Sequence, residues 1–420
     1  MKVLWITNFL FPEAEEVLNG SLKGNPFGGW MTSAAKQLAM QPDVDLAIAS
    51  VSRLVDDLRS VSCGKLLYFV IPMGKGNESI NYDYNHYWTI IYEDFKPDVI
   101  HIHGSEYSHG LSFVEACGFE HVIVSIQGMI SDCHSYYLAG IPSFEYLINT
   151  TARDLVKGTV FCEKRRIKKR SRYEVELLRS VKHIIGRTTW DRVHSLAINP
   201  DATYHFCNET LRSSFYSSHW SYRNCIPHTI FLAQASYPLK GAHQVLKALP
   251  AVLEKYPDAK VHIAGVDITR PGGFFNRLKL SSYGRIIRKL IRKSRLGDSV
   301  FFHGPLNESE MVRQYLSSNV FISPSSIENS PNSLCEAQLL GVPCIASFVG
   351  GIPDLIPDSE SGYLYRFEDV DVLSYYICKV FEESQSRTYD VMRSIAMERH
   401  DPGKNVQSLL GIYNRVIAED

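Results

Sequence analysis

Short apolar runs alternate with helical stretches along the whole chain, and this alternation starts a second time near residue 229. Such alternation predicts parallel sheets covered by helices on both faces. A chain of 420 residues is too long for one ordinary core. We therefore expect an α/β protein with two Rossmann-like, doubly wound domains facing across a cleft. The expected strands are 3–7, 45–50, 67–71, 99–103, 122–126, 183–186, 202–205, 229–233, 260–264, 300–303, 320–323 and 344–346.

The domain boundaries follow from the same pattern. Residues 1–206 are predicted to form the N-terminal domain and residues 228–385 the C-terminal domain. An aromatic and polar stretch without a clear period, 207–227, is expected to link them. Residues 386–420 are predicted to be helical.

Composition excludes several classes of protein. A formal net charge of −1 argues against a globally basic nucleic-acid binder, and nine cysteines without a C-x-x-C pair indicate reduced thiols in a cytoplasmic protein. The N-terminal run MKVLWITNFLFPE reads as a first strand and not as a signal peptide. No apolar run reaches the ~18 residues of a membrane span. Any membrane association is therefore expected to be peripheral.

Residues 318–347 carry the clearest chemistry, because they read as a strand, loop, helix and second strand with two carboxylates beside the helix start. Ser330 is predicted to cap this helix. The free N–H groups of Asn332 and Ser333 would then suit an anion. Glu336 falls one turn into the helix among apolar neighbours, so it needs hydrogen-bond donors such as sugar or ribose hydroxyls. Glu328 lies in the preceding loop and suits a second set of hydroxyls.

The spacing of Glu328 and Glu336, followed by GVPCIAS and GGIPDLI, resembles the E-x7-E signature of the retaining family-four glycosyltransferases. The resemblance implies a GT-B fold and metal-independent, hexosyltransferase-type transfer from a nucleotide-diphosphate sugar, with no cofactor. A UDP-sugar is favoured over a GDP-sugar. The implied acceptor is a saccharide or polyprenyl-linked saccharide, as in bacterial surface polysaccharide biosynthesis, and residues 386–420 would pack back on the N-terminal domain.

The resemblance also implies roles for individual residues in the second half. Glu328 would contact the donor sugar as a catalytic group, and Glu336 the ribose. Lys240 and Gly241 take the place of the family's diphosphate-binding Lys-Gly pair, but Ala235 stands where an arginine is usual. The remaining residues expected at the donor are Gly304, Leu306, Asn332, Ser333 and Leu334.

The first half matches the family more loosely. Gly28 and Gly29 open a helix and allow close approach of backbone N–H groups to a phosphate or acceptor. His103 and Arg187 are expected on the acceptor side. Gln127 stands where relatives place a histidine near the reacting carbon, so it is expected at the catalytic centre as a hydrogen-bonding group. His101 and His103 share one strand face, but no third ligand accompanies them, so no metal site is predicted.

Two basic segments, 162–173 and 276–296, stand out from the near-neutral total. The second combines helical spacing with an apolar stripe, as in amphipathic basic surface helices. A solvated face and docking on an anionic membrane at the inner face of the plasma membrane both fit. Nucleic-acid binding is disfavoured, since no aromatic base-stacking module accompanies these segments.

Two other activities remain open on the sequence. A non-catalytic nucleotide-sugar-binding partner subunit fits the absence of the arginine at Ala235 and the presence of Gln127. A hydrolase or epimerase acting on nucleotide sugars could use the same fold.

Overall fold

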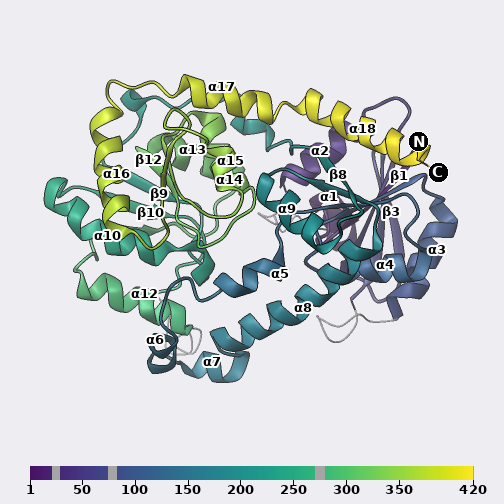
Figure 1. Cartoon of the computed structure of the whole chain (residues 1–420), viewed down its shortest axis with the longest axis horizontal. Helices are drawn as coiled ribbons and strands as arrows, with labels where there is room; N and C mark the ends of the chain where they lie inside the picture. Colours follow the sequence, from purple (N-terminus) through teal and green to yellow (C-terminus); the bar gives the residue numbers. More distant parts are fainter. Residues whose placement is uncertain (21–28, 74–82, 270–279, 420) are drawn as a thin grey trace. The chain divides into compact units, whose positions relative to one another are not determined.

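The computed structural model describes residues 1–20, 29–73, 83–269 and 280–419. The chain forms two compact units (Figure 1). Unit 1 comprises residues 1–131, 167–212 and 400–420, and unit 2 comprises residues 132–166 and 213–399. Each unit is built around its own largely parallel sheet, as the alternation of strands and helices predicts.

The sheet of unit 1 has eight strands in the order β3-β4-β2-β1-β5-β6-β7-β8. All neighbours are parallel except β3 and β4, which form an antiparallel edge. The strands are β1 (Lys2–Thr7), β2 (Asp45–Ser52), β3 (Arg59–Cys63), β4 (Leu66–Pro72), β5 (Val99–His103), β6 (Val122–Ser125), β7 (His183–Gly186) and β8 (Thr203–Phe206).

Helices cover both faces of this sheet. One face carries a core that includes Trp88, Phe113 and Leu177, and the other a core that includes Phe11 and Tyr413. The helices are α1 (Pro12–Asn19), α2 (Gly29–Ala39), α3 (Asp83–Phe95), α4 (His109–Cys117), α9 (Thr189–Ile198) and α18 (Pro402–Ala418). Two further helices, α5 (Ile130–Cys133) and α8 (Val160–Ser180), cross the boundaries between the units.

The sheet of unit 2 is fully parallel, with six strands in the order β11-β10-β9-β12-β13-β14. Buried aliphatic side chains on one face pack against α10 and α16, and Phe231 and Phe321 pack on the other face with Tyr315. The strands are β9 (Thr229–Leu232), β10 (Lys260–Ile263), β11 (Val300–Phe302), β12 (Val320–Ser323), β13 (Cys344–Ser347) and β14 (Tyr363–Tyr365).

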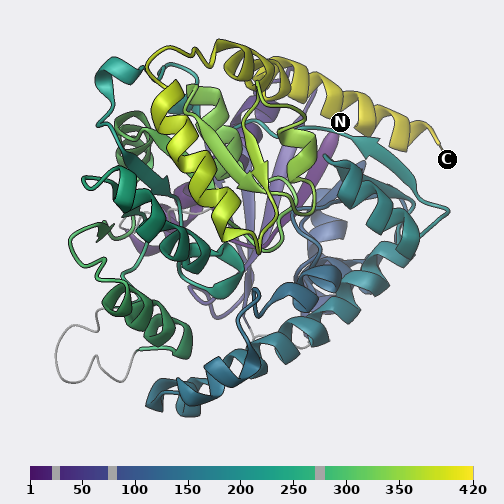
Figure 2. The ribbon, with the colours of Figure 1, turned by 60° about the vertical axis from the view of Figure 1, so that its left-hand side comes forward.

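Many short helices surround this sheet (Figure 2). Four are 3₁₀ helices: η1 (His134–Tyr136), η2 (Ser213–Phe215), η3 (Tyr222–Asn224) and η4 (Pro238–Lys240). The α-helices are α6 (Ser143–Ile148), α7 (Ala152–Lys157), α10 (Ala242–Lys255), α12 (Ser282–Lys293), α13 (Glu308–Ser317), α14 (Asn332–Leu340), α15 (Ile352–Leu355), α16 (Val370–Glu383) and α17 (Asp390–Arg399).

The predicted strands are all present, within two residues at each end. Two strands were missed. β3 is an exposed antiparallel edge strand of sequence RSVSC, which has no buried run to mark it. β14 has only three residues, too few to display a period.

The division into units differs from the predicted domain boundaries in three places. Residues 132–166 belong to unit 2, where Ile141, Tyr146 and Val160 join its core. Residues 213–227 of the predicted linker also belong to unit 2, where the indole Nε1 of Trp220 donates to the carbonyl of Ser318 at 2.8 Å. Within the predicted C-terminal helical region, α17 belongs to unit 2, and only the residues from His400 onward join unit 1.

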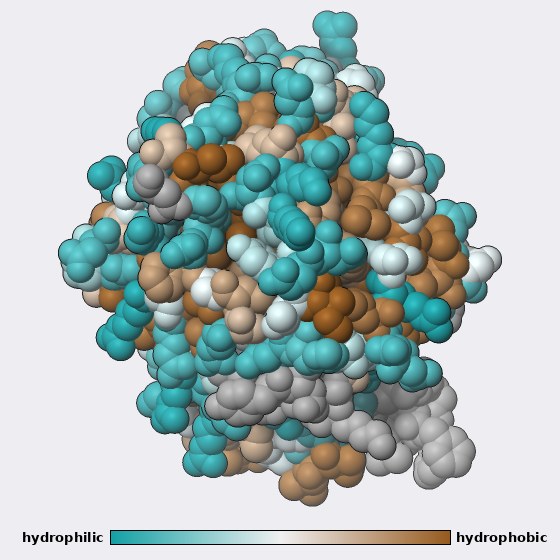
Figure 3. Space-filling model, turned by 90° about the vertical axis from the view of Figure 1, so that its right-hand side faces the viewer, coloured by the Kyte–Doolittle hydropathy of each residue, from teal (hydrophilic) through white to brown (hydrophobic). Residues whose placement is uncertain are grey.

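The surface helices bury one stripe of apolar side chains and expose the rest of their side chains to solvent. The face shown in Figure 3 mixes hydrophilic and hydrophobic side chains. Within the described residues, no helix combines the length and the apolar character that crossing a membrane requires.

Candidate functional site

Two of the predicted donor-binding residues meet where the strand order of unit 2 reverses. β10 and β12 flank β9 on opposite sides, so the carboxyl ends of β9 and β12 border a topological switch point. Ligands of doubly wound sheets bind at such points. Lys240 follows β9 and Glu328 follows β12, and Lys240 Nζ lies 2.5 Å from Glu328 Oε1. The hydroxyl of Ser325 also donates to this oxygen, at 2.8 Å.

The ion pair favours the charged form of Lys240. Burial on its own would lower the pKa of Lys240, but the charges of Glu328 and Tyr237 and the hydrogen bonds to both together outweigh burial and raise it. Lys240 Nζ also lies 5.8 Å from the ring centroid of Tyr237. Lys240 is therefore a fixed cation, which suits a phosphate oxygen as an alternative partner.

Two glycines allow the backbone to come close at this point. Gly241 has a φ of +67°, and a Cβ atom there would lie 1.6 Å from the carbonyl oxygen of Pro324. Gly350 has a φ of +51°, and a Cβ atom there would lie 1.9 Å from the carbonyl oxygen of Glu328. That carbonyl accepts the N–H of Gly351 at 3.0 Å. The loops carrying Lys240 and Glu328 therefore depend on glycine for their positions.

The N-terminus of α14 opens beside the same loop. The helix begins at Asn332 with Pro331 at the N-cap, and no side chain caps it. The predicted cap, Ser330, was wrong: its hydroxyl lies 4.0 Å from Cys335 Sγ instead. Because a proline side chain accepts no hydrogen bond, the first N–H groups of α14 suit an anion.

Other residues of α14 are buried. Glu336 is 4% exposed, within a helix whose residues from Leu334 to Leu340 are all buried. Leu334 packs fully in the core, and its N–H donates to the carbonyl of Pro331 at 3.0 Å. A buried carboxylate one turn from the open helix end is placed to accept from ligand hydroxyls.

The remaining residues predicted at the donor lie at strand ends of the same sheet. Gly304 and Leu306 follow the edge strand β11, and the carbonyl of Gly304 accepts from the N–H of Gly265 at 2.8 Å. Ala235, at the position where the resemblance leads one to expect an arginine, is 2% exposed and belongs to the core. Lys240 is thus the basic side chain that this loop contributes.

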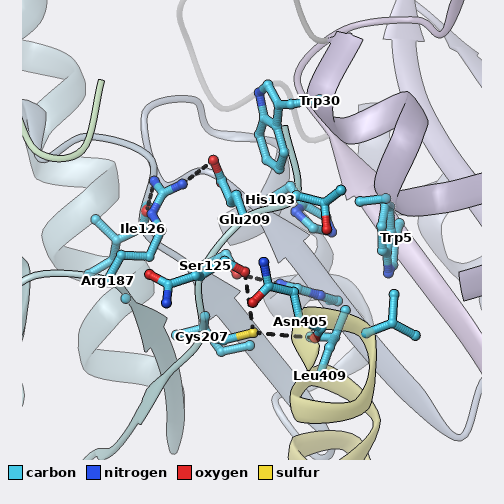
Figure 4. A pocket seen from close by; sticks show the side chains of 17 residues that line it. Trp5, Trp30, His103, Ser125, Ile126, Arg187, Cys207, Glu209, Asn405 and Leu409 are labelled. Carbon is cyan, nitrogen blue, oxygen red and sulfur yellow. Dashed lines mark hydrogen bonds and ion pairs between the residues drawn. The ribbon is translucent and has the colours of Figure 1, made fainter. Parts of the chain in front are cut away.

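Unit 1 has a second polar group, at the carboxyl ends of β6 and β7. Arg187 is 7% exposed and pairs through Nη1 with Glu209. Gln127 Nε2 donates to Glu209 Oε1 at 2.8 Å, while Arg187 Nη2 donates to the carbonyl of Ile126 at 3.0 Å. Figure 4 shows Arg187 and Glu209 beside each other. The sequence singled out Arg187 and Gln127, but Glu209 lies in the predicted linker and was missed.

His103 lines the same cavity as Arg187 and Glu209. Its ring stacks on His101 with centroids 3.8 Å apart, and it lines a cavity of about 50 Å³ together with Trp5 and Trp30 (Figure 4). Neither ring nitrogen has a hydrogen-bond partner among the described residues. Burial, then the neighbouring His101 and Arg187, hold the pKa of His103 well below its usual range. A cavity of this volume has room for a water molecule.

The arrangement of these histidines does not resemble a metal site. His101 is fully engaged, with Nδ1 2.7 Å from the Tyr413 hydroxyl and Nε2 2.5 Å from the Ser125 hydroxyl. Within the described part of the chain, no three His, Cys, Asp or Glu side chains gather as metal ligands would.

The structure adds a residue that the sequence did not suggest. Glu106 follows β5 at the switch point of unit 1, between β1 and β5, and accepts from Asn8 Nδ2 at 3.3 Å. Burial first, and then the charge of Glu174, raise the pKa of Glu106 to about 7, although hydrogen bonds from its own N–H and from Gly128 oppose this. Glu174 is fully buried and accepts from Ser105 at 2.8 Å. A lone glutamate in a loop carries no sequence signal.

The glycine pair of the first domain is only partly described. Gly28 lies outside the described residues. Gly29 begins α2, and a Cβ atom there would lie 3.0 Å from Arg212 Cδ.

Comparison with known proteins supports the resemblance. Residues 227–397 match the model of the family described as "Glycosyl transferases group 1". The sulfoquinovosyl transferase SQD2 of Arabidopsis thaliana is 29% identical over 134 residues, which cover 31% of this chain and 23% of that protein. The D-inositol 3-phosphate glycosyltransferase of Acidothermus cellulolyticus is 27% identical over 183 residues, covering 43% of this chain and 40% of that protein. The matched segments thus span less than half of these relatives.

Solved structures resemble the chain over its whole length. Sucrose-phosphate synthase from Thermosynechococcus elongatus superposes with a TM-score of 0.72 at 15% identity, covering 100% of both chains. HepE of Anabaena, solved with UDP and glucose, gives 0.65 at 12% identity and covers 99% of this chain and 100% of that one. The GT-B fold with two Rossmann-like domains and the resemblance to group 1 glycosyl transferases are therefore confirmed.

Proposed function

We propose that the protein is a retaining glycosyltransferase that moves a sugar from a nucleotide-diphosphate donor, with UDP favoured, to a saccharide or lipid-linked saccharide. One observation carries the proposal. Lys240, Glu328 and the uncapped start of α14 meet at the switch point of unit 2. This group combines a fixed cation, free N–H donors and carboxylates, which are the partners that a diphosphate and sugar hydroxyls require.

The donor would occupy this site by replacing internal partners. Its diphosphate takes the place of the Glu328 carboxylate at Lys240 Nζ and accepts from the N–H groups of Asn332 and Ser333. Glu328, released from the ion pair, accepts from hydroxyls of the donor sugar. Glu336 accepts charge-assisted hydrogen bonds from the ribose hydroxyls. In this scheme, Lys240 and the helix N-terminus supply the positive charge for the diphosphate.

The reaction is the exchange of one bond to the anomeric carbon for another. The bond from that carbon to the diphosphate oxygen breaks, and the bond to the acceptor oxygen forms on the same face. The proton of the acceptor hydroxyl passes to the departing diphosphate oxygen. Lys240 and the α14 N–H groups stabilise the negative charge that grows on the diphosphate, which is the main contribution asked of the chain. The remaining contribution of the chain to the rate is to position the donor and the acceptor.

The acceptor half of the proposal rests on unit 1. The carboxyl ends of its strands present Asn8, Glu106, Gln127 and Glu209, which combine donors and acceptors of the kind that bind saccharide hydroxyls. Gln127 has no titratable group, so it would orient a hydroxyl and not remove a proton.

Release of nucleoside diphosphate tests the proposal. The full chain is incubated with a panel of UDP- and GDP-sugars, with and without a lipid extract from the source cells. We expect release from one donor, dependent on the extract, and no release by the Glu336→Ala variant. Proton NMR of the product then reports whether the anomeric configuration of the donor is retained.

The absence of arginine at Ala235 favours one alternative, a subunit that binds nucleotide sugars without transferring them. Binding of donor without release under any condition would support that alternative. Release at the full rate without acceptor would instead indicate a nucleotide-sugar hydrolase.

A further inference from the structure

Unit 2 carries an exposed apolar surface that the donor site does not use. Large apolar side chains on α6 and α7 are between 56% and 86% exposed, and Leu155 and Val156 exceed every other exposed large hydrophobic side chain among the described residues. The set consists of Phe144, Leu147, Ile148, Leu155 and Val156. We call these five residues the α6–α7 apolar patch. Singly exposed apolar residues are common, but five within thirteen positions of the chain indicate a contact surface.

The segment that carries the patch is firmly attached to unit 2. The Thr151 hydroxyl donates to the carbonyl of Leu280 at 2.6 Å, and the N–H of Ser282 donates to Asp154 Oδ2 at 2.8 Å. Arg285 Nη1 donates to the carbonyl of Thr150 at 3.1 Å. These bonds join the α6–α7 turn to the start of α12, and both views in Figures 1 and 2 show α6, α7 and α12 together. The apolar side chains are therefore held outward by a fixed support.

The support is strongly basic. Residues 143–166 and 280–296 contain eleven Lys and Arg and only three Asp and Glu, whereas the whole chain has a formal net charge of −1. One of the three acids, Asp154, is buried and bonded to α12. On α12 the exposed side chains include Arg288, Lys289, Arg292 and Lys293. Exposed positive charge thus lies on α12, the helix to which the α6–α7 turn is bonded.

We propose that the α6–α7 apolar patch and α12 dock unit 2 on a bilayer that contains anionic lipid. Apolar side chains that project from a basic surface match the boundary between acyl chains and lipid phosphates. A protein partner is less well matched, because lysine is depleted from the cores of protein interfaces. The inference deepens the proposed function, on which its biological meaning rests, since it would bring the enzyme to a lipid-linked acceptor.

Sedimentation with vesicles tests the docking directly. The full chain is mixed with vesicles of phosphatidylcholine, either alone or with an equal amount of phosphatidylglycerol. We expect it to sediment with the anionic vesicles only, and less as salt screens the lysines and arginines. Absence of binding to the anionic vesicles, or equal binding to both kinds, would overturn the proposal.

Variants distinguish binding through the α6–α7 apolar patch from nonspecific binding through any exposed apolar side chain. Leu155→Ser with Val156→Ser should weaken binding to anionic vesicles by about tenfold, since two aliphatic side chains no longer enter the bilayer. Met40→Ser with Val193→Ser alters two exposed apolar side chains of unit 1, which are 70% and 59% exposed, and should bind as the unaltered chain does. Equal binding by both double variants would contradict the proposal. Arg288→Glu with Lys289→Glu should also weaken binding.

Two further measurements distinguish a failure of the membrane-docking proposal from a failure of the proposed transferase function. Affinity for UDP in solution should be unchanged in the Leu155→Ser, Val156→Ser variant, because the patch is not part of the donor site. If the chain proves to transfer no sugar, vesicle binding still stands or falls on its own. If size-exclusion chromatography shows a dimer that this variant abolishes, and vesicles do not bind, the patch contacts a second copy and the proposal is wrong.

Discussion

At the scale of single residues, the Lys240–Glu328 ion pair supplies one cation and one anion to the proposed donor site. Its two members should have separable effects, because the proposed function assigns the phosphate to Lys240 and the reacting sugar to Glu328. Glu328→Gln removes the negative charge but keeps the shape of the side chain. We expect kcat to fall about a hundredfold, with the dissociation constant of UDP changed by less than about threefold. Steady-state kinetics and calorimetric titration of UDP measure the two effects. A large loss of UDP affinity with kcat unchanged would assign Glu328 to binding the nucleoside instead of the reacting sugar.

Glu106 makes a second residue-scale prediction, on stability. Its pKa is raised from 4.5 to about 7 in the folded chain, chiefly by burial. The folded chain therefore binds more protons than the unfolded chain between these two values, and stability falls as pH rises through this window. Glu106→Gln removes this dependence and should stabilise the protein above pH 7 by about 2 kcal/mol, but not below pH 4. Urea unfolding across this pH range measures the difference. A constant difference at every pH would contradict the assignment.

At the scale of elements, the donor site depends on loops that pass within contact distance of one another. Gly241→Ala places a Cβ atom 1.6 Å from the carbonyl oxygen of Pro324 at a φ of +67°. Gly64→Ala is a matched control, since its φ is +61° and nothing lies within 4 Å of the added atom. We expect the control to lose about 1 kcal/mol and Gly241→Ala to lose at least about 3 kcal/mol, by thermal unfolding. Similar losses in both would show that the loop can move away from Pro324.

Local patterns gave the strands of both sheets and the helix of the E-x7-E segment, because buried strands and apolar helix faces have clear periods. Local patterns did not reveal which of the two sheets a given amphipathic helix packs against. Residues 132–166 were therefore placed in the wrong unit. Ser330 was wrong as a cap because the helix begins at Asn332, one residue later than predicted, which puts Pro331 at the N-cap position.

At the scale of the whole molecule, contacts between distant segments escaped prediction. Glu209 meets Gln127 and Arg187 only because β6, β7 and the segment after β8 end side by side. Glu106 and Glu174 gather in the same way from segments far apart in sequence. The exposed side chains of α6 and α7 were equally invisible, since an apolar residue in a helical pattern is expected to be buried. Topology, and not composition, brings these groups together.

Lys240 and the open end of α14 are proposed to form a nucleoside-diphosphate site, and calorimetric titration of UDP into the full chain tests for this site. Lys65→Ala, which removes an exposed lysine of unit 1, serves as the control. We predict that the unaltered chain and the control bind UDP equally, and that Lys240→Ala binds at least about tenfold more weakly, as the loss of a charge-assisted hydrogen bond requires. Equal UDP affinity in Lys240→Ala would contradict the account.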